Sequence, residues 1–211
     1  MKRTILTASA LVLLALAAAL SAPPPVCADE GGTMASSAVK ADILTWLKDA
    51  EDKLTQLAEA TPERKYSYRP GKGVRSTGEV FLHVAAANYV IPGFAGVKVP
   101  DGFNPETYEK SMTSKVDIVK ALKASFDHVN AALDNTSDAD MVREVDVFGT
   151  KRSVRSMYLL VLSHVHEHLG QSIAYARVNG IVPPWTAAQQ ARVAEKAKPV
   201  EKPQGKTAVK K

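Results

Sequence analysis

Residues 152–180 read RSVRSMYLLVLSHVHEHLGQSIAYARVNG. One set of side chains in this segment recurs at alternating steps of three and four residues, which is the spacing of one face of an α-helix. The members of this stripe are Val154, Met157, Val161, His164, His168, Gln171 and Tyr175. The pattern predicts an amphipathic helix from about Arg152 to Asn179, ended by Gly180 and the pair Pro183-Pro184.

Three earlier segments carry the same helical spacing, at about residues 37–60, 76–91 and 114–133. Their predicted inward stripes are Ile43, Leu47, Ala50, Leu54 and Leu57; Val80, His83, Ala87 and Val90; and Val119, Leu122, Phe126, Val129 and Leu133. Four helices with one apolar face each pack most simply around a single core. The predicted fold class is therefore all-α, a four-helix bundle with a long connection between helices 2 and 3.

The connections contain two smaller features. Asn104 and Pro105 predict a helical turn within the long connection, because they suit the cap and the first position of a helix. Val145–Phe148 predicts a brief extended piece that turns at Gly149. No segment shows the sustained two-residue alternation of a larger sheet, which agrees with an all-α fold.

The two ends of the chain differ in composition from its body. An apolar run follows Lys2 and Arg3, and a Pro-containing stretch follows the run, which is the pattern of a signal peptide cleaved near Ala28. Residues 29–185 make up the predicted bundle domain after a polar lead-in, and residues 186–211 predict a disordered tail rich in Lys, Ala and Pro. We therefore expect an exported protein, periplasmic or secreted, with no membrane span in its mature chain.

Charge and cysteine content exclude several functions. The net charge of +5 comes from the ends: residues 1–28 carry two cations and no acid, and residues 191–211 carry seven cations and two acids, so residues 29–190 have a net charge of −2. A slightly acidic body argues against a nucleic-acid partner. The single cysteine, Cys27, precedes the predicted cleavage site, so the mature protein would have no thiol nucleophile, thiolate ligand or disulfide.

Three histidines form a candidate metal site. His164 and His168 are four residues apart on one helix, so they emerge on the same face about one turn apart, and His83 occupies an inward position of the second helix. Neutral imidazole is a good ligand for zinc, nickel, copper or ferrous iron, and three protein ligands leave a coordination position open for water or substrate. The alternative is that each histidine is a core residue hydrogen-bonded to a neighbouring carbonyl or hydroxyl. His128 and His166 fall off the apolar stripes and are predicted to lie at the surface.

Other residues near this stripe leave two interpretations open. Glu79 could orient His83, or it could complete a capping box with Ser76. Gln171 and Tyr175 could line a cavity or bond to another helix. Two familiar motifs are absent: Gly170 stands where a metalloprotease H-E-x-x-H motif needs its second histidine, and the inward stripes lack the carboxylates of a di-iron bundle.

Several local motifs match a known family. His83 lies about eighty residues before His164-x-x-x-His168-Leu169-Gly170-Gln171, and Tyr175-Ala176-Arg177 then precedes Gly180 and Pro183-Pro184. The segment ahead of the second helix carries Tyr68-Arg69-Pro70. In these motifs the chain resembles the DinB/YfiT-like superfamily over about residues 36–185. It departs from the family pattern at Leu169, where arginine is frequent.

The resemblance implies a four-helix bundle that holds one divalent metal ion through His83, His164 and His168. It also implies a possible homodimer, because members often pair. The family includes thiol-dependent transferases and metal-dependent hydrolases, and the predicted export signal argues against the former because bacillithiol-like cofactors belong to the cytosol. We therefore expect an exported metal-dependent enzyme of hydrolase or transferase type, with an unknown substrate. The alternatives are a non-catalytic metal- or small-molecule-binding protein of the cell envelope, and a plain interaction module.

Overall fold

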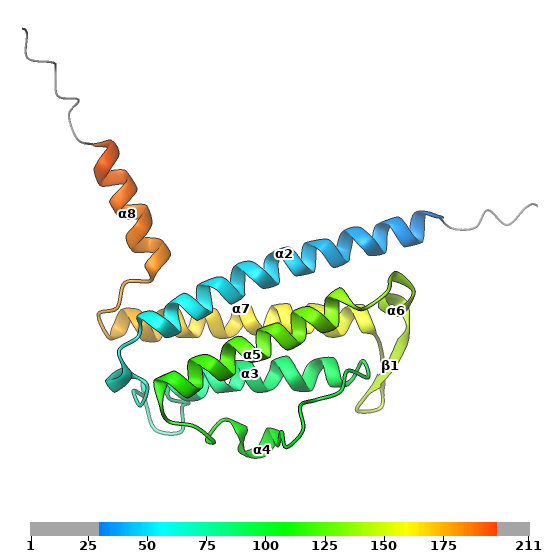
Figure 1. The fold of residues 1–211 in the computed structure, drawn as a ribbon, viewed down its shortest axis with the longest axis horizontal. Helices are drawn as coiled ribbons and strands as arrows, with labels where there is room; N and C mark the ends of the chain where they lie inside the picture. Colours follow the sequence, from blue (N-terminus) through cyan, green and yellow to red (C-terminus); the bar gives the residue numbers. More distant parts are fainter. Residues whose placement is uncertain (1–29, 198–211) are drawn as a thin grey trace, which may run out of the picture.

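The computed structural model describes residues 30–197, with side chains from residue 37 onward. This part of the chain is mainly helical and contains one small two-stranded sheet (Figure 1). The four long helices are α2 (Glu30–Ala60), α3 (Thr77–Gly93), α5 (Lys115–Asp134) and α7 (Val154–Val178). The short elements are η1 (Glu63–Lys65), α4 (Pro105–Tyr108), α6 (Asp138–Val142), β1 (Glu144–Val147), β2 (Thr150–Ser153) and α8 (Pro184–Lys196). The all-α prediction is confirmed at this level.

The long helices pack around one core. Helix α3 contacts α5 and α7, and α2 contacts α7 and α5 (Figure 1). All five predicted inward residues of α2 are buried, as are Phe126 and Val161 in the facing helices α5 and α7. These side chains drive the packing because removal of apolar surface from water is the main favourable term in folding.

Serine side chains mark where three of the long helices begin. Ser76, Ser114 and Ser153 each accept a hydrogen bond from a backbone N–H in the first turn of α3, α5 or α7. Such caps satisfy donors that have no partner inside the helix, so each helix begins at a defined residue. The predicted capping box of Ser76 and Glu79 is complete in α3.

The predicted inward stripe of α3 is incomplete. Val80 is buried, whereas His83, Ala87 and Val90 are only half-buried, and most of the helix between Thr77 and Pro92 is buried on its other sides. Helix α3 is covered by α5, by α7 and by the connection that carries α4, so it has no fully solvated face. A helix that is buried from several directions has apolar side chains on more than one face. The residue spacing therefore could not identify the buried residues of α3 as a single stripe. In α5, similarly, Ile118 is buried where Val119 was expected.

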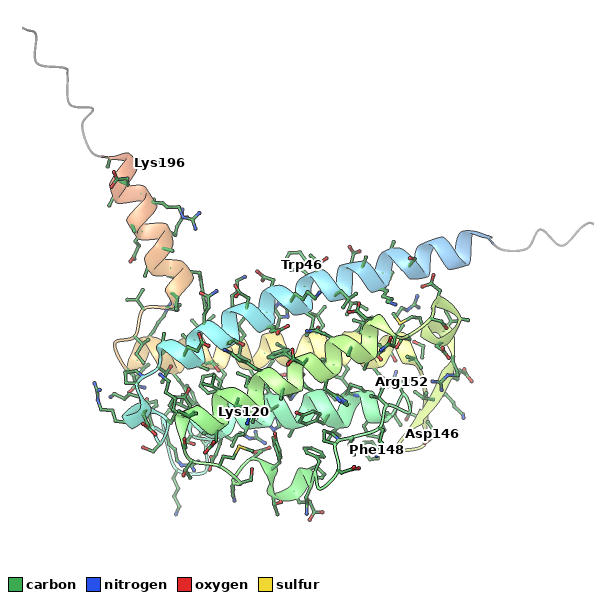
Figure 2. The ribbon with its side chains drawn as sticks, in the orientation of Figure 1. Trp46, Lys120, Asp146, Phe148, Arg152 and Lys196 are labelled. Carbon is green, nitrogen blue, oxygen red and sulfur yellow. The ribbon has the colours of Figure 1, made fainter. Side chains whose placement is uncertain are left out.

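The connections agree with the sequence in part. Helix α4 begins after Asn104, with Pro105 at its first position, as predicted. Residues 145–147 of the predicted extended piece lie in β1, and Phe148 lies in the turn that follows. The strand β1 pairs with β2 in an antiparallel hairpin, and this second strand delays the start of α7 to Val154. Phe148 lies at the hairpin tip with a positive φ of 52°, and Figure 2 shows it there beside Asp146.

The ends of the described region differ from the predictions. Helix α2 begins at Glu30, so the predicted polar lead-in is largely helical. The disordered tail was predicted from residue 186, and this prediction is wrong for residues 186–196, which lie in α8. Pro184 in the first turn and the following run of alanine and glutamine favour a helix even without a buried face. The predicted signal peptide, residues 1–28, and the rest of the tail, residues 198–211, lie outside the described residues.

Helix α8 stands away from the four long helices near the C-terminal end of α2 (Figure 1). None of its residues is buried, although Trp185 at its start is packed against the core. Within residues 30–197, no helix combines the length and the apolar character needed to cross a bilayer.

Candidate metal centre

The three histidines singled out in the sequence meet where α3 packs against α7. His83 comes from the second turn of α3, and His164 and His168 come from successive turns of α7. Their ring centroids lie 4.5 to 4.9 Å apart. One ligand nitrogen from each ring lies within 4.8 Å of the other two, so the cluster could hold a metal ion.

The closest approach is between His83 and His164, whose Nε2 atoms are 3.1 Å apart. Two nitrogens that each lie about 2.1 Å from one zinc ion are separated by roughly 3.0–3.4 Å, depending on the coordination angle. The Nδ1 atom of His164 is buried and has no hydrogen-bond partner. A cation that joins the two Nε2 atoms would leave this Nδ1 atom as it is, so the fit of the site to a metal rests on the 3.1 Å separation and on the chemistry of three imidazole donors.

His83 and His164 are held in the neutral form that metal binding requires. Burial lowers the pKa of His83, although the hydrogen bond to Glu109 opposes this effect. Burial, reinforced by the neighbouring rings of His168 and His83, lowers the pKa of His164 to about 4. Near neutral pH both rings therefore keep a lone pair available for a cation.

A carboxylate fixes the ring of His83. Glu109, one residue beyond α4, places its Oε1 atom 2.5 Å from His83 Nδ1. Burial opposes ionisation of this side chain, but hydrogen bonds from Arg75 and His83 lower the pKa of Glu109 overall. Because a carboxylate only accepts hydrogen bonds, the neutral His83 ring carries its proton on Nδ1, and its Nε2 lone pair faces the cluster.

A second chain of hydrogen bonds fixes His168. His168 Nδ1 lies 2.7 Å from Gln171 Oε1, Gln171 Nε2 donates to Tyr175 Oη over 3.0 Å, and Tyr175 Oη donates to the carbonyl oxygen of Arg75 over 3.3 Å. The terminal carbonyl can only accept, so each earlier partner donates in the same direction. His168 therefore carries its proton on Nδ1, and its Nε2 lone pair is free for a cation.

The sequence model of the DinB superfamily matches residues 47–172. This range is more than half of the chain and includes all three histidines. The chain belongs to the DinB superfamily. Two solved structures share the fold, a DinB-like protein from Bacillus cereus with a TM-score of 0.60 and a DinB-like protein from Bacillus subtilis with a TM-score of 0.55. Each is 22% identical in sequence, and each alignment covers 67% of this chain and 93% of the other. No curated protein matches the chain.

The remaining predictions in this DinB superfamily member have mixed outcomes. His166 is exposed, as predicted, with Nδ1 2.9 Å from the carbonyl oxygen of Leu162. The surface prediction for His128 is wrong: this ring is half-buried 5.0 Å from the ring of Tyr89, and its Nε2 atom is buried. Tyr89 also contacts Phe103 and Tyr108, so the long connection covers this part of α3, which sequence spacing could not show.

The structure also decides between the interpretations left open around the histidines. Glu79 completes the capping box of α3, and its carboxylate accepts hydrogen bonds from Arg69 and from the backbone N–H of Ser76. Glu109 is the carboxylate that contacts His83. Sequence reasoning missed Glu109 and Arg75 because both lie in connections, where no helical period assigns a side chain to a face.

Proposed function

We propose that this protein binds one divalent metal ion through His83, His164 and His168, and that this site serves a metal-dependent reaction of hydrolase or transferase type. The observation that carries the proposal is the meeting of three imidazoles, two of them with Nδ1 hydrogen-bonded to an acceptor. The motifs shared with the DinB superfamily support the same three ligands. A divalent ion held there supplies Lewis-acid chemistry, with zinc, nickel and iron all suited to imidazole.

The surrounding residues would hold this site in place. In our proposal α2, α3, α5 and α7 form the four-helix bundle predicted from the sequence, and the α3 to α7 contact aligns the ligands. Glu109 and Gln171 orient His83 and His168, and Tyr175 supports Gln171. We further propose export to the periplasm or the exterior, on the sequence pattern of residues 1–28.

One observation favours a second candidate, a non-catalytic metal-binding protein of the cell envelope. Hydrolysis needs a proton acceptor beside the reacting groups. Within the described residues, the carboxylate that contacts the histidines is Glu109, and both of its oxygens are already engaged by Arg75 and His83. A protein that only binds a metal needs no free base.

Metal content tests the proposal. Tag-free mature protein, dialysed against a weak chelator, should contain close to one equivalent of metal per chain by elemental mass spectrometry. His168→Ala should remove most of this metal, whereas His166→Ala, an exposed histidine on the same helix, should leave it unchanged. Wild-type protein that holds no metal after exposure to zinc, nickel, iron and copper would overturn the proposal.

A solvent-exchange measurement then separates the two candidates. Water proton relaxation in the presence of bound Mn²⁺ or Co²⁺ should be enhanced if the ion keeps an open position, which the enzyme requires. Little enhancement of water proton relaxation would favour the second candidate, the non-catalytic metal-binding protein.

A further inference from the structure

Both hydrogen-bond chains that orient the histidines end on the same residue, Arg75. Its guanidinium group donates two hydrogen bonds to Glu109, from Nε to Oε2 over 2.7 Å and from Nη2 to Oε1 over 3.1 Å. Its backbone carbonyl accepts the hydrogen bond from Tyr175. The side chain of Arg75 thus supports the hydrogen bonds that lead to His83, here called the His83 arm. Its main chain supports the hydrogen bonds that lead to His168, the His168 arm.

We propose that Arg75 is the positioning residue of the centre, which fixes the orientation and the protonated nitrogen of both His83 and His168. This inference rests on the proposed metal site for its purpose, but the hydrogen bonds that carry it are present in the protein itself. The hydrogen bonds of Arg75 go to Glu109 and Tyr175, so it positions His83 through Glu109 and His168 through Tyr175 and Gln171.

The position of Arg75 is well determined by its neighbours in the chain. It immediately precedes Ser76, the capping residue of α3, so its backbone is tied to the start of the helix that carries His83. Arg69 holds the preceding loop by pairing with Glu79 and by donating to the carbonyl oxygen of Val74 over 2.7 Å. The carbonyl of Arg75 is therefore a fixed acceptor, which the His168 arm requires.

The two hydrogen bonds from the Arg75 side chain to Glu109 have a different role. Glu109 follows the four-residue helix α4 in the long connection, and a segment of that length has little intrinsic stability. A two-point contact between guanidinium and carboxylate is geometrically specific, so it fixes which oxygen faces His83. Without Arg75 the carboxylate could turn away from the ring, and His83 would lose its preference for a proton on Nδ1.

Two substitutions separate the arms. Arg75→Met removes the guanidinium group and keeps the carbonyl, so it should disturb His83 alone. Tyr175→Phe removes the hydroxyl and keeps the ring that contacts Tyr68, so it should disturb His168 alone. Arg64→Met is the matched control, because Arg64 is exposed in η1, away from the histidines.

The first readout needs no metal. Long-range ¹⁵N correlation spectra of the metal-free wild type should show His83 and His168 with the proton on Nδ1. Arg75→Met should give a mixture of tautomers at His83 with His168 unchanged, and Tyr175→Phe should give the converse. Arg75→Lys keeps the charge but offers no two-point grip, so it should fall between the wild type and Arg75→Met.

The second readout is affinity for Zn²⁺ by competition with a chromophoric chelator. Loss of a direct hydrogen-bond partner of a ligating histidine weakens metal binding by about 10–100-fold. Arg75 and Tyr175 hold such partners in place, so Arg75→Met and Tyr175→Phe should each weaken Zn²⁺ binding measurably, by up to that factor. Arg64→Met should bind as the wild type does. Unchanged tautomers and unchanged affinity in both site variants would overturn the assignment of Arg75. A wild type that binds no metal would overturn the metal proposal instead, and the tautomers would still decide the role of Arg75.

Discussion

His83 and His164 face one another across the contact between α3 and α7, with their Nε2 atoms 3.1 Å apart although 81 residues separate them in the sequence. Neither helix alone contains the cluster, because His83 comes from α3 and the other two histidines from α7. The site therefore exists only when the two helices are docked. Metal binding at such a site is linked to folding, since the unfolded chain does not hold the three rings together.

This linkage predicts that metal stabilises the protein. Zn²⁺ at one hundred times its Kd should raise the free energy of unfolding of the metal-free protein by about 2.7 kcal/mol. Urea titrations with and without Zn²⁺ measure the increment. His83→Ala should lose it and His166→Ala should keep it. An equal increment in both variants would mean that the ion binds elsewhere.

Glu51 provides a pH-dependent prediction away from the site. It lies on α2 and accepts a hydrogen bond of 2.7 Å from Asn130 Nδ2 on α5, and burial raises its pKa despite this bond. Asn130 Oδ1 is buried without a partner. Glu51→Gln removes the half-buried charge and offers a donor to that oxygen, so it should stabilise the protein by about 0.5–1 kcal/mol near neutral pH.

The gain from Glu51→Gln should shrink in acid. A carboxyl group with a raised pKa takes up its proton in the folded state before it does so in the unfolded state, so the wild type recovers stability relative to the variant as the pH falls. Urea denaturation at about pH 7 and about pH 4.5 tests this, with the exposed Glu63→Gln as the control. A gain that grows in acid would contradict the argument.

Two helical glycines should respond oppositely to alanine. A Cβ atom at Gly78 would lie 3.0 Å from Ile118 Cδ1 and 3.3 Å from Tyr66 Cδ1, whereas at Gly170 it would meet nothing within 4 Å. Gly78→Ala should therefore destabilise the protein by about 1–3 kcal/mol through overpacking. Gly170→Ala should stabilise it by about 0.5–1 kcal/mol, because alanine loses less conformational freedom in a helix. Chemical denaturation measures both, and the same sign for the two variants would refute this description of the packing.

Helix α8 should contribute little to stability. None of its residues is buried, and Trp185 at its start packs against the core. A chain that stops after Trp185 should unfold within about 0.5 kcal/mol of the full chain, and it should bind Zn²⁺ with the same affinity. A larger loss would show that α8 packs on the body in solution.

Local sequence determined the four long helices and the starts of several helices. Apolar side chains at helical spacing gave α2, α5 and α7, and Ser76 and Asn104 marked the starts of α3 and α4. Local sequence also selected the three histidines, because residues four apart on a helix share a face whatever the rest of the fold does. These features depend on contacts within one or two turns, which the spacing of residue types encodes directly.

Tertiary structure decided what surrounds those histidines. Glu109 reaches His83 across 26 residues and Arg75 reaches Glu109 across 34, and both distances depend on the path of the long connection over α3. This connection, together with α5 and α7, covers the sides of α3 that the stripe assigned to solvent. A connection has no fixed period, so its side chains find their partners only after the helices have packed. The sequence by itself therefore determined the three histidines of the candidate centre, and the packing determined the residues that orient two of them.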